Sequence, residues 1–162
     1  MLIRNAEIKD LPSVMEIYQL ARKFMKDNGN PTQWENGYPQ EEIIRSDIEV
    51  GNFYVCEAES RIVGVFTFFI GEEPNYRDIQ EGCWHSEETY GVIHRVASDG
   101  SVRGFSGKCF TFCREKCRYL RIDTHRDNQP MQNALQRFGF RECGIVRVED
   151  GTERIAFDYE AR

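Results

Sequence analysis

A glycine-rich segment from Val96 to Gly107 is the part of this sequence whose composition most directly suggests ligand chemistry. Gly100 and Gly104 lie inside it, and glycine lets a backbone turn tightly and approach a ligand closely. If a helix begins within the segment, its free main-chain N–H groups and positive dipole end point at one place. That arrangement binds phosphate or pyrophosphate groups. Many glycine loops are only turns, so this second interpretation stays open at this point.

The residues on either side of the glycine segment predict the elements that would present it. Residues 89–97 are mostly β-formers with few turn residues, which favours a strand. Residues 108–117 repeat apolar side chains at helical spacing, so a helix is predicted over about 104–117. The segment therefore connects a strand to a helix, which is the context that a phosphate site needs.

The rest of the chain predicts a regular succession of elements. A helix begins after Asp10, a suitable N-cap, and ends at Asn28 to Pro31. Its predicted apolar face consists of Leu11, Val14, Met15, Ile17, Tyr18, Ala21, Phe24 and Met25. Further helices are predicted at 41–48 and 129–138, and strands at 2–6, 53–56, 62–70, 119–124, 140–148 and 153–159. Residues 57–61 predict an antiparallel hairpin turn, and residues 71–88 a long polar connection.

Two local motifs within this order resemble the GNAT N-acetyltransferases. Val96, Ser101, Gly104 and Ser106 follow the spacing of the family's acetyl-CoA-binding signature, although Ser101 stands where Gln or Arg is usual and Ser106 where Gly or Ala is usual. Asn128 precedes Gly139-Phe140 by the family's interval between its Asn and its Gly-Phe. The resemblance covers nearly the whole chain. It implies an α+β fold of three layers in a single domain, 1–162, with a mixed, mostly antiparallel sheet and splayed fourth and fifth strands.

The same resemblance implies where acetyl-CoA, the expected co-substrate, would bind. The main-chain N–H of Val96 would bind the pantetheine arm, and the N–H of His94 would face the acetyl carbonyl and stabilise the oxyanion. Asn128 would bind the pantetheine arm, cap the following helix, or do both. The pyrophosphate would lie on the main-chain N–H groups of Val102, Arg103, Gly104, Phe105, Ser106 and Gly107. No metal is expected.

Acetylation of an amine also needs a base for the amine and an acid for the CoA thiolate. Strand alternation predicts one face formed by Glu88, Tyr90, Val92, His94 and Val96. Glu88, His94 and also His85 are candidate bases, whereas Tyr90 occupies a position where some family members have a glutamate. The tyrosine that often serves as the acid is replaced by Leu135, which leaves water or His125 as proton sources.

The loop of residues 31–39 separates the first two predicted helices and carries two large aromatic side chains, Trp34 and Tyr38. Such a loop covers a substrate in many enzymes, because loops over a rigid scaffold often determine specificity. Simple packing of the two rings against the core is the alternative. Trp34 and Tyr38 are therefore candidate substrate-binding residues.

Composition narrows the class of protein. The net charge of -6 and pI near 5.2 argue against nucleic acid as a partner. No apolar run is long enough for a membrane span, and residues 1–6 predict a strand rather than a signal peptide, so we expect a cytoplasmic protein. Cys109, Cys113 and Cys117 share a helical stripe, which we interpret as core packing rather than a metal or redox site.

These observations favour an N-acetyltransferase that moves the acetyl group from acetyl-CoA to a primary amine of a small molecule, amino acid or peptide. Direct attack within a ternary complex is expected, because no cysteine has the family context of a covalent nucleophile. The altered Ser101 and Leu135 keep two alternatives open: a non-catalytic acyl-CoA-binding or regulatory module, and transfer of another acyl group on the same scaffold. A homodimer is a possible assembly.

Overall fold

The computed structural model describes residues 1–161, in which seven strands form one sheet in the order β1-β2-β3-β4-β5-β7-β6. All neighbouring strands are antiparallel except β4 and β5, which are parallel. The sheet is therefore mixed and mostly antiparallel, as predicted. The strands are β1 (Leu2–Asn5), β2 (Phe53–Ala58), β3 (Arg61–Ile70), β4 (Gly91–Ser98), β5 (Tyr119–Thr124), β6 (Arg141–Arg147) and β7 (Glu153–Glu160).

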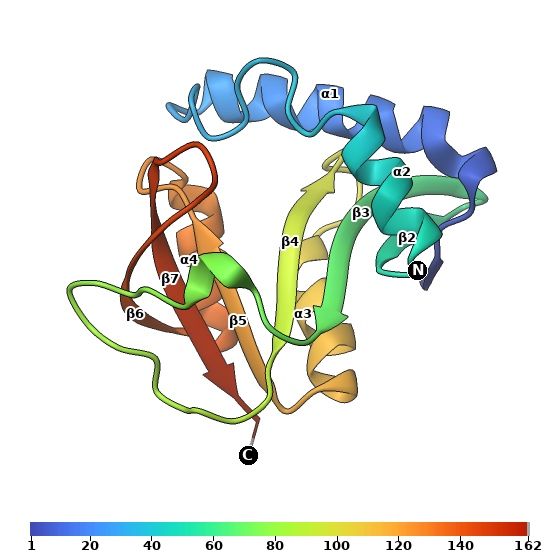
Figure 1. Ribbon diagram of the computed structural model, residues 1–162. Helices are drawn as coiled ribbons and strands as arrows, with labels where there is room; N and C mark the ends of the chain where they lie inside the picture. The colour runs from blue at the N-terminus through green and yellow to red at the C-terminus, as the bar shows by residue number, and fades with distance from the viewer. Residues whose placement is uncertain (162) are drawn as a thin grey trace.

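Four α-helices cover the two faces of the sheet and make the three predicted layers (Figure 1). They are α1 (Leu11–Asp27), α2 (Glu41–Glu49), α3 (Phe105–Lys116) and α4 (Gln129–Phe138). Helices α1 and α2 pack on one face, over β2, β3 and β4, whereas α3 and α4 pack together on the other. Short 3-10 helices, η1 (Ile8–Asp10) and η2 (Pro74–Tyr76), precede α1 and interrupt the long connection.

The boundaries of most elements are within two residues of the predicted ones, and two local details differ. The hairpin turn is shorter than predicted, because only Glu59 and Ser60 separate β2 from β3, both with positive φ. Asp10 precedes α1 as predicted but makes no side-chain cap. Its carboxylate instead accepts hydrogen bonds from Arg4 at 2.8 and 3.0 Å and from the main chain of Glu7 at 2.7 Å.

Each face of the sheet has its own hydrophobic core. The core under α3 and α4 contains Phe110 and Leu135, and the core under α1 and α2 contains Tyr18 and Ile44. Cys109 and Cys113 are fully buried in the first of these cores, which confirms packing as their structural role. A buried thiol beside aromatic rings needs no partner to be stable there.

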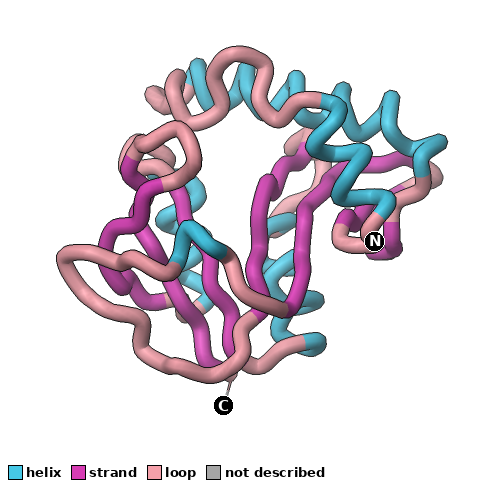
Figure 2. Tube along the Cα trace, viewed as in Figure 1, coloured by secondary structure: helices cyan, strands magenta, loops and turns pink. Residues whose placement is uncertain are grey.

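Residues 71–90 form a long, mostly irregular connection that crosses the lower part of the sheet in Figure 2. An antiparallel bridge between Gln80 and Ile145 attaches it to β6, and Tyr76 and Trp84 pack with Val92 in a third apolar cluster. The connection therefore closes the β5–β7 side of the sheet. Among residues 1–161, no helix combines the length and the apolar character that a membrane span needs.

Candidate active site

The sheet opens between β4 and β5, as predicted. Only two residue pairs join these strands, Gly91 with Leu120 and Val92 with Arg121, and beyond them the strands diverge (Figure 1). Main-chain groups along the inner edges of diverging strands need other partners, because unpaired N–H and C=O groups are costly to bury. The opening therefore offers an unpaired strand edge that suits an extended ligand.

A groove of about 420 Å³ lies at this opening, between the C-terminal half of α1, the C-terminal end of β4 and the first turns of α3 and α4. Leu20 and Phe24 project into it from α1 and remain 52% and 55% exposed. The prediction that Phe24 belongs to the buried face of α1 is therefore wrong. The groove is also lined by Val96, Phe105, Ser106, Asn128, Pro130 and Met131.

The glycine segment starts α3 at one side of this groove. Gly104 is the N-cap residue with φ of 73°, and no side chain caps the helix. The N–H groups of the first turn, Phe105 to Gly107, therefore have no acceptor within the helix. A Cβ atom at Gly104 or Gly107 would meet no atom within 4 Å. The open space and the free donors fit a phosphate or pyrophosphate group, the first interpretation of this segment.

Three other residues of the glycine segment, Ser101, Val102 and Arg103, differ in their surroundings. The Ser101 hydroxyl donates to Asp99 at 2.6 Å, and the Ser101 main chain donates to the same carboxylate at 2.8 Å. Ser101 thus stabilises the turn rather than reaching toward the helix start. Arg103 is exposed, whereas Val102 is half-buried.

A β-bulge near the end of β4 overturns the predicted alternation along this strand. Thr67 of β3 pairs with His94 and Val65 with Ala97, so β4 carries one extra residue there, and Arg95 has φ of 55°. Val96 consequently packs toward the core under α3, not on the face of Val92 and His94. The extra residue reverses the alternation of side chains along β4. The main chain of Val96 therefore faces the opening between β4 and β5.

The same ladder corrects the role expected of the His94 main chain. Phe68 donates its N–H to Asn52 at 2.8 Å, on the β2 side of β3. Alternation along β3 then turns Thr67 toward β4, and the N–H of its partner His94 faces Thr67. This N–H points into the β3 ladder, so it does not suit an oxyanion donor in the opening.

The His94 side chain lies in a polar cluster on the face of the sheet covered by α1 and α2. Its Nε2 atom is 3.1 Å from Oε2 of Glu73, and both side chains are mostly buried, with 18% and 13% exposed. The main chain of Glu73 donates to the Tyr90 hydroxyl at 2.9 Å. Burial alone would raise the pKa of Glu73, but the bonds from His94 outweigh it and hold that pKa below its usual value. Glu73 is therefore a carboxylate that orients the imidazole.

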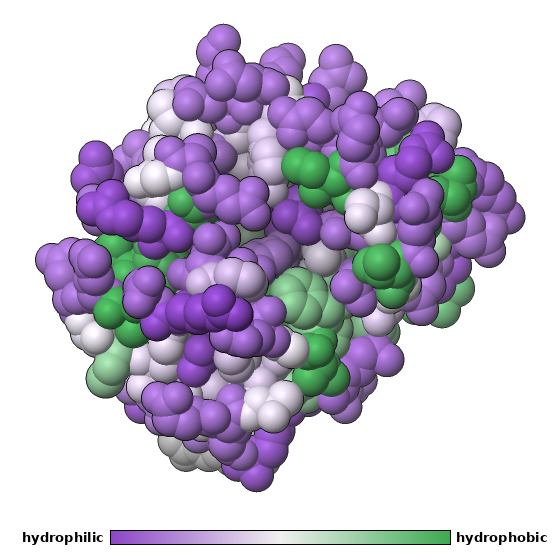
Figure 3. All heavy atoms as spheres, in the orientation of Figure 1, coloured by the Kyte–Doolittle hydropathy of each residue, from purple (hydrophilic) through white to green (hydrophobic). Residues whose placement is uncertain are grey.

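Tyr76 extends this cluster from β4 to β5. Its ring centroid is 6.1 Å from that of His94, and its hydroxyl donates to Asp123 of β5 at 2.6 Å. Burial and the nearby Asp123 raise the pKa of Tyr76 well above its usual value, so the phenol keeps its proton. Figure 3 shows that this face of the molecule is hollowed near its centre, with hydrophilic residues above the hollow and hydrophobic residues at its lower right.

Arg95 carries a positive charge beside this cluster, but its charge is balanced. Its guanidinium lies 2.6 Å from Asp47 of α2 and donates to the Tyr38 hydroxyl at 3.0 Å. The Tyr18 hydroxyl of α1 donates to the Arg95 main-chain oxygen at 2.6 Å. These bonds connect both covering helices to the bulge and hold the strand in its irregular conformation.

Glu88 and His85 lie outside the His94 cluster. Glu88 precedes β4 and accepts a hydrogen bond from Ser86 at 3.2 Å, with Arg118 3.8 Å away. The prediction that it shares the strand face of His94 is wrong, because β4 begins only at Gly91.

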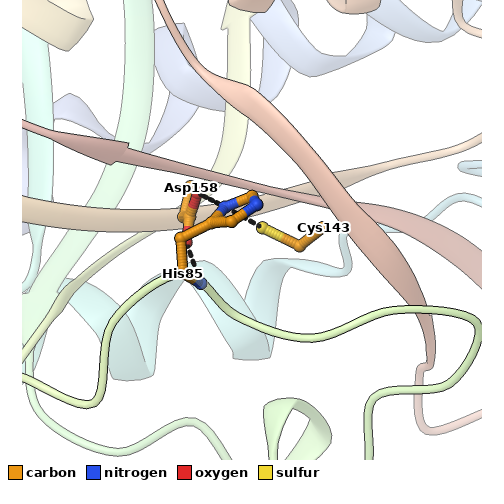
Figure 4. Close-up of side chains that lie close together, drawn as sticks. All are labelled: His85, Cys143 and Asp158. Carbon is orange, nitrogen blue, oxygen red and sulfur yellow. Dashed lines mark hydrogen bonds and ion pairs between the residues drawn. The ribbon is translucent and has the colours of Figure 1, made fainter.

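His85 anchors the connection to the sheet (Figure 4). Its main-chain N–H donates to the buried Asp158 at 2.8 Å, its Nδ1 is 2.7 Å from the same carboxylate, and Cys143 Sγ is 3.4 Å from Nδ1. Cys143 and Asp158 face the same ring nitrogen, so the imidazole cannot pass a proton between them as a catalytic triad would. Burial raises the pKa of the Cys143 thiol, so this cluster is a hydrogen-bonded anchor.

Asn128 caps α4, since its side-chain oxygen accepts from the Met131 main chain at 3.2 Å. Its amide nitrogen donates to Gln33 of the 31–39 loop at 3.0 Å. His125 lies beside the same loop, with Nε2 3.3 Å from the Thr32 hydroxyl. Burial and nearby Arg154 lower the pKa of His125, which favours its neutral form. The loop is thus attached to the turn that follows β5.

Trp34 and Tyr38 belong to that loop, and their rings point inward against other parts of the protein. Trp34 lies edge-on against Tyr18 at 5.5 Å and borders the core under α1, while Tyr38 binds Arg95. Both rings are half-buried, so packing accounts for their positions. Their role toward a substrate remains a prediction.

Sequence reasoning missed Glu73, Tyr76 and Asp123, which the fold adds to the His94 cluster. Glu73 and Tyr76 belong to a mostly polar connection without regular periodicity, and no local spacing relates it to β5. The one usable signal was Tyr90, which occupies the position where some family members have a glutamate. If the site uses a carboxylate, another segment of the chain must supply it. The fold supplies it as Glu73, which Tyr90 holds by its main chain.

Comparison with known proteins finds solved structures that share this fold. No protein-family model and no curated protein sequence matches the chain. Among solved structures, it is similar to a GNAT-family acetyltransferase from Streptococcus agalactiae 2603, with TM-score 0.90, 28% identity, and 99% of this chain and 95% of that chain covered. A GNAT-family acetyltransferase from Listeria monocytogenes 4b F2365 gives a TM-score of 0.73 at 19% identity, with 98% and 94% covered. A ribosomal-protein-alanine N-acetyltransferase from Brucella melitensis gives 0.64 at 19% identity, with 99% of both chains covered.

The sheet opens between two parallel strands, beside a helix that begins at a glycine without a side-chain cap, and the GNAT-family structures named above share this fold. The chain has the fold of the GNAT superfamily of acetyltransferases, as the sequence resemblance predicted.

Proposed function

We propose that this protein transfers the acetyl group of acetyl-CoA directly to a primary amine within a ternary complex. The observation that carries the proposal is the position of the His94–Glu73 pair at the opening between β4 and β5, next to the groove. A base beside an opening that admits a thioester is the arrangement that amine acetylation needs.

The groove and the start of α3 are the proposed acetyl-CoA site. The N–H groups from Val102 to Gly107 hold the pyrophosphate, where the helix dipole favours negative charge. Leu20 and Phe24 cover the pantetheine arm, and the Val96 main chain pairs with it along the strand edge. Asn128 joins this contact through its second amide N–H, because the first donates to Gln33.

His94 is the proposed base. Its imidazole takes one proton from the acceptor ammonium, and Glu73 stabilises the imidazolium that forms. The neutral amine then attacks the thioester carbonyl carbon, forming the N–C bond, and the C–S bond breaks as the tetrahedral intermediate collapses. The amide nitrogen releases its second proton and the CoA sulfur gains one, so the reaction releases one proton in total.

No side chain is assigned as the acid. Leu135, at the family's usual tyrosine position, is fully buried in the core and carries no proton. His125 favours its neutral form and both its ring nitrogens have neighbours, Thr32 and the main chain of Asp127. We therefore propose that the departing thiolate is protonated through solvent.

The similar structures leave the acceptor open. One is named for ribosomal-protein alanine and another for agmatine, at 19% and 13% identity to this chain. Trp34 and Tyr38, in the loop of residues 31–39, are the proposed contacts to the part of the acceptor beyond its amine group. The alternative, an acyl-CoA-binding module without turnover, is favoured by Ser101 and Leu135. A different acyl group remains a further possibility for the same groove.

The test combines calorimetric titration with acetyl-CoA and a thiol-release assay on a panel of primary amines. Gly104→Asp places a carboxylate against the pyrophosphate, and we expect acetyl-CoA affinity to fall at least about tenfold. Gly104→Asn is the matched control, because Asn tolerates a positive φ and adds no charge. We expect micromolar acetyl-CoA binding and amine-dependent thiol release in the native protein. Binding without release on any amine supports the non-catalytic module, and equal affinities of the two variants contradict the assigned loop.

A further inference from the structure

We propose that Asp123 selects acceptors that carry a positive charge at neutral pH, so that this enzyme takes alkylammonium compounds rather than neutral nucleophiles. The inference rests on the proposed function, because it assigns a specificity residue to the same site.

Asp123 occupies the β5 side of the opening, level with His94 on β4. The last pairs between these strands are Gly91 with Leu120 and Val92 with Arg121, and the same register continued by two residues sets His94 opposite Asp123. Both side chains lie on the face of Tyr76, whose ring neighbours His94 and whose hydroxyl binds Asp123. A nucleophile that approaches the opening from this face therefore passes between the imidazole and the carboxylate.

The charge of Asp123 is not balanced by the protein. Its one side-chain hydrogen bond within residues 1–161 comes from the neutral phenol of Tyr76, and no cation of these residues lies within 4 Å of it. Asp123 is half-buried, so a small ligand reaches it while water screens it less than at the surface.

The arginines of β4 and β5 that lie near this opening, Arg95 and Arg121, are engaged with other partners. Arg95 pairs with Asp47 at 2.6 Å. Arg121 lies between the rings of Trp84 and Tyr90, 4.1 and 4.0 Å from their centroids, and donates to the Ser86 main chain at 2.8 Å. These contacts direct the guanidinium groups away from Asp123. The carboxylates of Glu73 and Asp123 thus give the opening a negative charge that an incoming ammonium group neutralises.

The ligand chemistry follows from this geometry. An alkylammonium group offers three N–H donors and a full positive charge, which suits one carboxylate at the opening and an imidazole opposite it. A hydroxyl group or an arylamine lacks that charge at neutral pH. Asp123 therefore holds the reacting nitrogen while His94 removes its proton.

The test uses benzylamine, a cation at neutral pH, and benzyl alcohol, its neutral counterpart, as probes of the CoA-saturated protein. Isotope-labelled protein is titrated with each probe, and the amide signals of residues 94 and 123 are followed by NMR. Asp123→Asn keeps an acceptor for the Tyr76 hydroxyl and removes only the charge. Asp127→Asn removes the same charge from an exposed position in the next turn, so it controls for long-range electrostatics and folding.

We expect benzylamine to shift both signals, and its affinity to fall about tenfold or more in Asp123→Asn but not in Asp127→Asn. Benzyl alcohol should leave the signals in place. Equal binding of the two probes, equal effects of the two variants, or no response to benzylamine would each overturn the role of Asp123. Calorimetry on the same sample separates the two proposals, since loss of acetyl-CoA binding contradicts the proposed function itself.

Discussion

At the scale of single residues, the proposed chemistry depends on a histidine whose orientation comes from a distant loop. His94 and Glu73 are 21 residues apart, and Tyr90 holds the main chain of Glu73 in place. The carboxylate orients the imidazole ring, and in the proposed mechanism it also stabilises the positive charge of the protonated ring. A similar carboxylate–imidazole arrangement is used by enzymes with unrelated folds.

The first residue-scale prediction concerns the base. His94→Gln should lower kcat/KM for amine acetylation about 100-fold or more, because it removes the proton acceptor, while acetyl-CoA affinity stays the same. Glu73→Gln should have a smaller effect in the same direction. Steady-state thiol release and calorimetric titration measure the two quantities separately.

His85→Gln is the matched histidine control, since His85 bonds to Asp158 and lies outside the His94 cluster. We expect its folded form to keep a near-native rate. A loss of rate in His85→Gln that equals the loss in His94→Gln would show that the wrong histidine has been assigned as the base.

At the scale of elements, the site is shaped by two departures from regular structure. The bulge in β4 turns Val96 away from the face of His94, and the last turns of α1 extend past the core and leave Leu20 and Phe24 exposed. Exposed apolar side chains on a helix normally weaken solubility, so a groove lined by them is suited to an apolar ligand arm. One face of α1 therefore packs on the core, and the adjacent face lines the groove.

The element-scale prediction is a separation of binding from stability. Leu20→Ser and Phe24→Ser together should weaken acetyl-CoA binding by about tenfold, because the pantetheine arm loses apolar contact. The free energy of unfolding should change by less than about 1 kcal/mol, since both side chains are already half exposed. Calorimetric titration and denaturant unfolding measure the two effects.

Val50→Ser is the matched control, as Val50 is 65% exposed and lies after α2, outside the groove. It should change neither quantity. A double variant that binds acetyl-CoA as tightly as Val50→Ser would remove α1 from the proposed site.

At the scale of the whole molecule, the connection of residues 71–90 links stability to the site. Asp158 is fully buried and accepts hydrogen bonds from the main chain and ring of His85 and from the Tyr119 hydroxyl, the last at 2.8 Å. The same connection carries Glu73 and Tyr76. Loss of the Asp158 carboxylate removes the acceptor for all of these bonds at once, so it is expected to destabilise the fold around this connection.

The corresponding prediction is a pH-dependent loss of stability in Asp158→Asn. Burial alone would raise the pKa of Asp158, but the bonds from His85 and Tyr119 outweigh it, and that pKa lies below its usual value. The carboxylate therefore stabilises the fold above the unfolded-state pKa of about 3.9, and this contribution is lost as the pH falls through the lower folded-state pKa.

Asp158→Asn should cost about 2 to 4 kcal/mol at neutral pH and less at acid pH, as measured by denaturant unfolding across that range. Asp150→Asn, in the exposed turn between β6 and β7, should change stability far less. A cost for Asp158→Asn that stays constant down to about pH 3 would contradict the assigned cause.

The sequence by itself determined the order of the elements, most of their boundaries, the glycine that starts α3 and the family. These features depend on local spacing: helix α4, for example, ends where Gly139 adopts φ of 117°. Only the tertiary structure decided which side chains meet at the opening. Tyr76 and Asp123 are 47 residues apart, and Val96 changes face because of a bulge defined by the partner strand. Local patterns report periodicity within an element, whereas a reactive cluster depends on register between elements and on a loop with no periodicity of its own.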